Sequence, residues 1–157
     1  RRLEKSFRLQ NADLLTEYNL IEAGLARPTV KDADFHGKSA YVTQRALDSQ
    51  PAYLCTLTMT DNRDQSGVER YPVGTCPVVD PDSGEVLIDE LGRRSYTTSI
   101  AYGPSVGKNI ALAYLPKAYA EEGRELLLEY FDELFPIKVE AIGCKGLYDP
   151  ENLLPRQ

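Results

Sequence analysis

Apolar and polar residues alternate most regularly between residues 52 and 60. In this stretch, AYLCTLTMT, the side chains of Tyr53, Cys55, Leu57 and Met59 fall on one face, and mostly threonines fall on the other. Successive side chains of a β-strand point to opposite faces of the sheet, so this period of two predicts a strand.

Most of the residues after this strand also show β-type patterns separated by turn signals. The segment RELLLEYF (124–131) is rich in Glu and Leu, which also favour a helix. A strand is preferred because the segment lies between turn signals in a β-rich half of the chain. The other predicted features are a polar loop at 61–72, a hairpin-like excursion at 74–92, and strands at 93–103, 109–116 and 137–143.

The first part of the chain has a different pattern. Leu3 and Phe7 are four residues apart, which predicts that residues 1–10 are the tail of a helix. Residues 17–30 mix apolar and β-branched types around a glycine and a proline, which predicts a short, interrupted strand.

A second helix is predicted between residues 34 and 50. Asp34 is a candidate N-cap, and the helix must stop before Pro51, because the residue that precedes a proline is disfavoured in the helical conformation. The apolar face expected to point inward consists of Ala40, Val42, Ala46 and Leu47.

Together these elements predict an α+β protein with two parts. Residues 1–50, a helix plus a strand remnant, are expected to be the truncated end of a middle domain. Residues 51–157 are expected to form a mostly antiparallel β-barrel. Because the pattern begins inside a helix, we also expect the chain to be a piece of a larger protein whose missing part covers its apolar surface.

Composition limits the classes of partner. The chain has 157 residues, 42% of them hydrophobic, which is enough for one globular core. Its formal net charge of −6 argues against a nucleic-acid surface, which would be basic. No apolar run approaches the roughly 18 residues that a membrane-spanning helix needs. We therefore expect neither a nucleic-acid nor a membrane partner.

The residue types that bind metals or act as nucleophiles are sparse. Cys55, Cys76 and Cys144 are far apart and form no CxxC pair, and with the single His36 they make no zinc site. We expect three reduced thiols and a reducing compartment. His36 has no nucleophile near it in the sequence, so a surface histidine is the simpler interpretation.

Three further patterns favour structural explanations over functional ones. The stretch GPSVGKN is too short for a phosphate-binding loop and predicts a hairpin turn. Arg93 and Arg94 could meet an anionic ligand, but an exposed strand end is the simpler interpretation. The last pattern is a group of acids that predicts a solvated face: Glu121, Glu122, Glu125, Asp132 and Glu133.

Six further segments form a recognisable series along the chain: RLEKSF (2–7), LIEAGL (20–25), DFHGKSAY (34–41), YTTS (96–99), GPSVGKNIALAYLP (103–116) and LYDPEN (147–152). In this order they resemble the C-terminal half of the folate-binding T-protein of the glycine cleavage system. Their sequences are most similar to the T-protein-like part of the dimethylglycine and sarcosine dehydrogenase group.

The resemblance implies a one-carbon transfer reaction that uses tetrahydrofolate. It also implies a flavin domain, with FAD, and a folate domain upstream in the same protein, and flavin-dependent oxidative N-demethylation of dimethylglycine, sarcosine or a related small amine. The implied compartment is the bacterial cytoplasm or the mitochondrial matrix. Contacts with partner chains or an oligomer are also expected.

The resemblance implies no catalytic residue within the chain, because the family's catalytic Asp and pterin-binding residues precede the RLE motif. The candidate folate contacts are Phe7, Arg27, where many T-proteins have a Trp, and Tyr96. Each has a structural alternative: helix packing for Phe7, a core or strand-surface position for Tyr96, and loss of the contact for Arg27. Arg2 and Glu4 also match the family, either as a structural ion pair or near a ligand.

Two other functions remain open. One is a stand-alone folate-dependent aminomethyltransferase or demethylase without a flavin domain. The other is a non-catalytic β-barrel interaction domain without affinity for a pterin.

Overall fold

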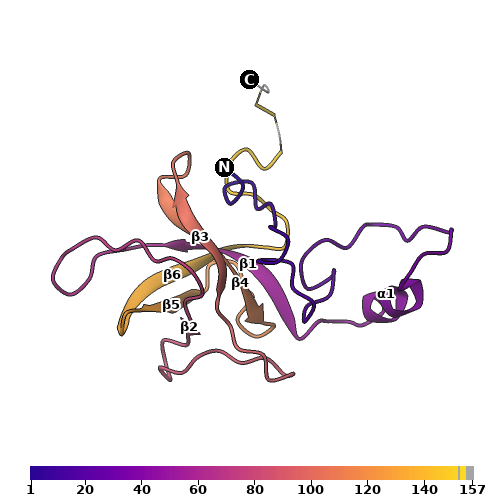
Figure 1. Ribbon diagram of the computed structural model, residues 1–157, viewed down its shortest axis with the longest axis horizontal. Helices are drawn as coiled ribbons and strands as arrows, with labels where there is room; N and C mark the ends of the chain where they lie inside the picture. Colours follow the sequence, from indigo (N-terminus) through magenta and orange to yellow (C-terminus); the bar gives the residue numbers. More distant parts are fainter. Residues whose placement is uncertain (152, 155–157) are drawn as a thin grey trace.

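The computed structural model describes residues 1–151, 153 and 154, and its main feature is one antiparallel sheet (Figure 1). The order of the strands across the sheet is β2-β5-β6-β1-β4-β3. Their bounds are Ala52–Met59 for β1, Val78–Val79 for β2, Thr97–Gly103 for β3, Lys108–Pro116 for β4, Glu125–Tyr130 for β5 and Glu133–Ile142 for β6.

The sheet curls until its two edges meet, as a barrel requires. The N–H of Val78 donates to the carbonyl of Ser95 at 3.0 Å, and the N–H of Thr97 donates to the carbonyl of Cys76 at 2.9 Å. These bonds join the β2 edge to the residues at the start of β3. The prediction of a mostly antiparallel barrel is confirmed.

The strand pattern at 52–60 is confirmed, but both faces of β1 are buried. Cys55, Leu57 and Met59 point into the core of the barrel, where they join Phe135 and Val139. The opposite face of the strand is also covered, although a half-exposed strand would leave it in water. Something other than the barrel must therefore pack on the outside of β1.

The N-terminal segment covers this outer face. Leu3 and Ala23 are buried in a second apolar cluster with Leu54, Leu112 and Tyr114 of β1 and β4. The N-terminal turn also lies beside the segment that follows β6, because the N–H of Leu147 donates to the carbonyl of Glu4 at 2.8 Å (Figure 1).

The predicted helix at 1–10 and the predicted strand at 17–30 are both wrong. Both segments consist of turns, and Ser6 and Asn11 adopt left-handed φ angles of 57° and 63° that no regular helix contains. The spacing of Leu3 and Phe7 mimics a helix, but only Leu3 is buried. Packing on the sheet therefore determines the path of this segment more than its local periodicity.

One helix is found near its predicted place, but its orientation differs from the prediction. Helix α1 spans Lys38–Arg45 and begins at Gly37, at φ 80°, and not at Asp34. In Figure 1 it lies to the side of the barrel, away from the strands. None of its side chains is buried, so the prediction that Ala40, Val42, Ala46 and Leu47 face inward is wrong. The side chain of Arg45 instead holds the helix to the loop before it, through hydrogen bonds to the carbonyls of residues 27 and 28.

The strand interpretation of residues 124–131 is confirmed. Strands β5 and β6 form a tight hairpin in which Tyr130 pairs with Glu133. The two residues between them, Phe131 and Asp132, have φ angles of 51° and 60°, as a type I′ turn requires. The C-terminal tail contains no strand or helix among its described residues. Asn152, which ends the predicted LYDPEN match, and residues 155–157 lie outside the described part of the chain.

Candidate functional site

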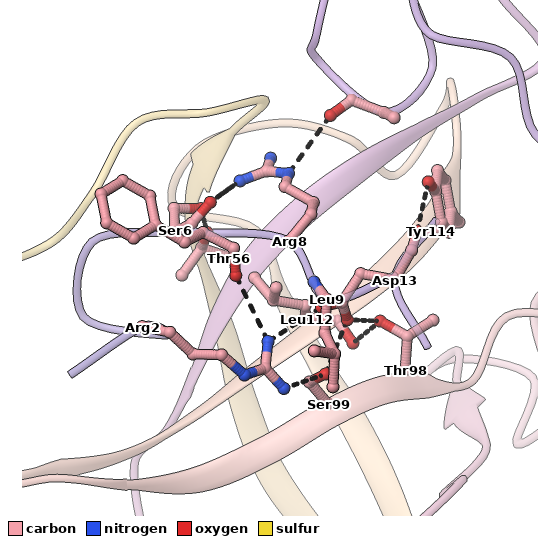
Figure 2. Close-up of polar contacts among 12 residues, drawn as sticks. Arg2, Ser6, Arg8, Leu9, Asp13, Thr56, Thr98, Ser99, Leu112 and Tyr114 are labelled. Atoms are coloured by element: carbon pink, nitrogen blue, oxygen red, sulfur yellow. Dashed lines mark hydrogen bonds and ion pairs between the residues drawn. The ribbon is translucent and has the colours of Figure 1, made fainter. Parts of the chain in front are cut away.

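The carboxylate of Asp13 binds the N-terminal segment to the barrel, although it is a charged group with 0% exposure. Figure 2 shows Arg2 pointing toward it from one side and Thr98 and Ser99 from the other. Arg2 Nη1 lies 2.9 Å from Asp13 Oδ2, and the hydroxyls of Thr98 and Ser99 donate to Oδ1 at 2.6 and 2.7 Å. A buried carboxylate is tolerated only with such a full set of partners.

This arrangement revises the roles predicted for the RLE motif. Arg2 does form a structural ion pair, but its partner is Asp13 and not Glu4. Glu4 is also buried, and its carboxylate accepts the N–H of Ser105 at 2.6 Å. Arg2 and Glu4 thus anchor the first turn of the chain to two different parts of the β3–β4 hairpin.

The segment after Asp13 is held by stacked aromatic rings. Tyr114 of β4 donates its hydroxyl proton to the carbonyl of Asp13 at 2.8 Å. The ring of Tyr18 lies flat on that of Tyr114, with centroids 3.6 Å apart and planes 3° from parallel. Burial raises the pKa of both phenols above the usual value, so both rings stay neutral.

Arg93 completes this stack and is not the exposed strand end that the sequence predicted. Its guanidinium lies 4.2 Å from the centroid of Tyr18, on the ring. It pairs with Glu22 at 2.5 Å and with Asp89 at 2.7 Å, and its side chain is only 12% exposed. Arg93 therefore joins the excursion at 74–92 to the N-terminal segment.

A large pocket opens next to this stack. Its volume is about 690 Å³, and it lies between residues 18–37 and helix α1. This size is typical of sites for small organic molecules. The side chains that give it its chemical character are Tyr18, Arg27, Lys31, Asp34, Phe35 and Tyr41.

The pocket combines aromatic walls with an excess of positive charge. The rings of Phe35 and Tyr41 lie 6.5 Å apart at an angle of 59°. Arg27 and Lys31 bring two cations against the single carboxylate of Asp34. Such a pocket suits a ligand with a flat ring and an anionic end.

The three candidate folate contacts do not come together in the described residues. Arg27 lines the pocket beside α1. Phe7 is 63% exposed on the N-terminal turn. Tyr96 lines a separate hollow of about 310 Å³ together with Arg94. The roles of all three in folate binding remain predictions.

The residues that organise this region were missed in the sequence. Asp13 stood in a segment that looked like the end of a helix, and Tyr18 and Glu22 in one that looked like a strand. One signal could have indicated them: this segment contains many polar and aromatic residues close to apolar residues, such as Leu3 and Ala23, that are buried against the sheet. Their partners are about 70 to 100 positions away in the sequence, so no local pattern connects them.

His36 lines the pocket as an exposed side chain, in agreement with the surface position predicted for it. Cys55, Cys76 and Cys144 are free thiols, and burial raises the pKa of Cys55 to about 12, so this thiol is unreactive. Within the described residues no His, Cys, Asp or Glu side chains gather in groups of three that could hold a metal ion. No helix of the described chain is long and apolar enough to span a membrane.

Comparison with solved structures shows the same fold in a known protein. The crystal structure of the glycine cleavage system aminomethyltransferase T from Bartonella henselae matches with a TM-score of 0.70 and 21% identity. The match covers 89% of this chain and 36% of that protein. At this identity the likeness concerns the fold.

Comparison with curated sequences finds relatives that are much longer. The mitochondrial dimethylglycine dehydrogenase of Rattus norvegicus is 29% identical over 140 residues, and that of Homo sapiens is 30% identical over 137 residues. These matches cover 88% and 86% of this chain but 14% of each relative. The chain therefore spans about a seventh of the length of these relatives.

The sequence model of one protein family, described as the glycine cleavage T-protein C-terminal barrel domain, matches residues 54–142. This stretch runs from β1 to the end of β6, which is the barrel itself. The chain therefore belongs to the family of the glycine cleavage T-protein C-terminal barrel domain.

Proposed function

We propose that this chain is the C-terminal part of a tetrahydrofolate-dependent one-carbon transfer enzyme that is coupled to flavin-dependent N-demethylation. The amine would be dimethylglycine, sarcosine or a related small compound. In this proposal residues 1–50 end a middle, folate-binding domain, and residues 51–157 form the C-terminal barrel. The chain alone would be inactive, because the catalytic groups and the FAD would lie on upstream domains.

The observation that carries the proposal is the extent of the similarity to dimethylglycine dehydrogenases. It covers 86% to 88% of the chain, which is more than the barrel matched by the family model. The turns and the helix outside the barrel are therefore shared in part as well. A barrel reused for an unrelated function would be expected to lose these outer segments first.

The residues of the large pocket fit part of a folate. A folate has a flat ring system and ends in a glutamate with two carboxylates. Phe35 and Tyr41 offer aromatic faces, and Arg27 and Lys31 offer cations for the carboxylates. When bound, tetrahydrofolate would supply the nitrogen atoms that accept the one-carbon unit as a methylene group.

The reaction balances with a flavin as the electron acceptor. Dimethylglycine, oxidised flavin and tetrahydrofolate would give sarcosine, reduced flavin and methylenetetrahydrofolate. The residues of this chain would bind and orient the folate and keep water away from one side of it. This last role would prevent loss of the one-carbon unit as formaldehyde.

The experiment uses the complete polypeptide that contains this chain. Dimethylglycine and sarcosine are supplied with an artificial electron acceptor, with and without tetrahydrofolate, and both formaldehyde and methylenetetrahydrofolate are measured. We expect formaldehyde without tetrahydrofolate and mainly methylenetetrahydrofolate with it. If the polypeptide oxidises neither amine, or if added tetrahydrofolate leaves the products unchanged, the proposal is wrong.

The same material distinguishes the two alternatives. A stand-alone aminomethyltransferase or demethylase requires an intact polypeptide of modest mass without a flavin spectrum. A non-catalytic interaction domain requires that the intact polypeptide has no affinity for tetrahydrofolate. The dimethylglycine dehydrogenases to which the chain is similar are mitochondrial proteins, which favours a mitochondrial compartment for this chain. The alternative is the bacterial cytoplasm. Subcellular fractionation would distinguish the two compartments.

A further inference from the structure

A second pocket, beside the C-terminal end of β1, has its own set of chemical groups. Its volume is about 460 Å³, and it lies between the end of β1, the polar loop at 61–71 and the β3–β4 hairpin. It shares no lining residue with the large pocket beside α1. The side chains that matter for recognition are Asn62, Glu69, Tyr71, Tyr102 and Asn109.

The polar loop that forms one wall is built around a buried carboxylate. Asp64 accepts hydrogen bonds from the hydroxyl and N–H of Ser66, at 2.6 and 2.9 Å, and from the N–H of Val68 at 2.9 Å. Arg70 pairs with its other oxygen at 2.6 Å. The loop is therefore ordered before any ligand arrives, which lowers the entropic cost of binding.

A second pair of bonds closes this loop across its base. The N–H of Arg70 donates to the carbonyl of Asn62 at 2.6 Å, and Asn62 Nδ2 donates back to the carbonyl of Arg70 at 3.0 Å. These bonds place Glu69 and Tyr71 at the mouth of the pocket, opposite the hairpin that carries Tyr102.

The mouth of the pocket has the character of a site for an alkylated cation. Tyr71 and Tyr102 both line it and are both more than half exposed. The carboxylate of Glu69 accepts the hydroxyl proton of Tyr71 at 2.7 Å, and so adds a negative charge beside that ring. Two aromatic faces and one carboxylate attract a methylated ammonium group, which loses less hydration on binding than a primary ammonium group does.

At the inner end of the pocket, the side-chain amide of Asn109 donates its hydrogen bond to a poor acceptor. Asn109 is 8% exposed, and within the described chain its side chain makes one long hydrogen bond, 3.9 Å from Nδ2 to the sulfur of Met59. A thioether sulfur is a weak acceptor, so a carboxylate oxygen would be a better partner for this amide. The neighbouring Lys108 points to the opposite face of β4, where it pairs with Glu140 at 3.6 Å.

The geometry points to a binding site for a small zwitterion that joins an N-methylated ammonium to a carboxylate. Its ammonium group lies between Tyr71, Tyr102 and Glu69, and its carboxylate reaches Asn109. The lining residues alone carry this inference, so it stands whether or not the chain serves the reaction proposed above. In that reaction, however, such a site would respond to the same class of compound as the substrate.

The test is calorimetric titration of the intact polypeptide with glycine betaine and with dimethylglycine. Two further probes separate the groups of the ligand: 3,3-dimethylbutanoate replaces the ammonium by a neutral carbon, and choline lacks the carboxylate. We expect the zwitterions to bind and each of the two other probes to bind about tenfold more weakly. Equal binding of 3,3-dimethylbutanoate, or no binding of either zwitterion, would overturn the inference.

Variants assign the binding to this pocket and distinguish it from an amine site elsewhere on the polypeptide. Tyr102→Ala should weaken the betaine site about tenfold, whereas Tyr102→Phe, which keeps the ring, should retain it. Phe131→Ala is the matched control, because Phe131 is an exposed aromatic residue at the tip of a different hairpin. Unchanged affinity in Tyr102→Ala would show that betaine binds elsewhere and would contradict the inference, even if the amine is oxidised normally.

Discussion

Gly24 and Gly143 touch through their backbones, where the N-terminal segment meets the end of β6. A Cβ atom added to Gly24 would lie 2.5 Å from the Cα of Gly143, and Gly24 has a φ of +69°. A glycine is needed at position 24 for this approach, because any side chain there would be both strained and in collision with backbone atoms of residues 143 and 144. The contact fixes how closely the outer segment packs on the barrel.

We predict that Gly24→Ala lowers the free energy of unfolding by about 3 kcal/mol, from the left-handed φ and the backbone clash together. Chemical denaturation followed by circular dichroism would measure it. Gly84→Ala is the matched control, since Gly84 has a φ of +73° but no atom within 4 Å of its added Cβ. Gly84→Ala should lower the free energy of unfolding by about 1 kcal/mol, because only the left-handed φ angle is unfavourable there. Equal costs for the two variants would mean that the close approach to Gly143 contributes nothing.

A second prediction concerns the buried carboxylate of Asp13. Asp13→Asn should lower the free energy of unfolding by about 3 kcal/mol, because it leaves the guanidinium of Arg2 without its counter-charge and replaces one acceptor by a donor facing Thr98 and Ser99. Thermal and urea denaturation would measure the loss. Asp82→Asn, at an exposed position in a turn, should change the stability by less than about 0.5 kcal/mol. A stability loss in Asp13→Asn no larger than in this control would show that the network is not needed.

The acid dependence of the polar loop at 61–71 provides a third prediction. The hydrogen bond from Ser66 above all, and those from Val68 and Arg70, lower the pKa of Asp64 to about 2. The unfolded value is about 3.9, so the ionised carboxylate stabilises the loop above that pH, and this contribution is lost as the pH falls through about 2. A carboxyl titration followed by NMR should show Asp64 titrating below the exposed aspartates.

Asp64→Asn should disorder the same loop already at neutral pH and remove its acid transition. Asp61→Asn is the control within the loop, because Asp61 accepts a hydrogen bond from the N–H of Arg63 but does not lie at the centre of the loop. Amide hydrogen exchange of residues 62–70 would report both variants. A normal carboxyl pKa for Asp64 would contradict the prediction.

A fourth prediction separates the candidate folate contacts. In the intact polypeptide, Arg27→Ala should weaken tetrahydrofolate binding about fivefold, since a cation of the large pocket is lost. Arg63→Ala, on the polar loop of the barrel, should leave it unchanged. Fluorescence titration with tetrahydrofolate would measure both. If Arg27→Ala binds as tightly as the control variant, the large pocket does not hold the folate.

Phe7 and Tyr96 need the same titration. Phe7 is exposed on the described chain, so its ring is accessible to a ligand. Under the proposed function, we expect Phe7→Ala and Tyr96→Ala to weaken tetrahydrofolate binding. Unchanged affinity in either variant removes that residue from the site.

The strands of the barrel could be predicted because their signal is local. Alternation in β1 and the turn signals around β5 and β6 need only neighbouring residues. The same kind of reasoning failed for residues 1–30. There the spacing of Leu3 and Phe7 imitates a helix, while the actual turns are held by distant groups such as Ser99 and Tyr114.

By itself, then, the sequence determined the antiparallel strands, the hairpin turns, and through its motifs the resemblance to the T-protein family. Only the tertiary structure decided that Asp13 is buried, that Arg93 lies on Tyr18, and that α1 stands away from the barrel. The physical reason is that a strand can be predicted from the alternation of apolar and polar side chains two positions apart in the sequence. A buried charge such as that of Asp13 instead depends on groups far away in the sequence, here Thr98 and Ser99, that only folding brings beside it.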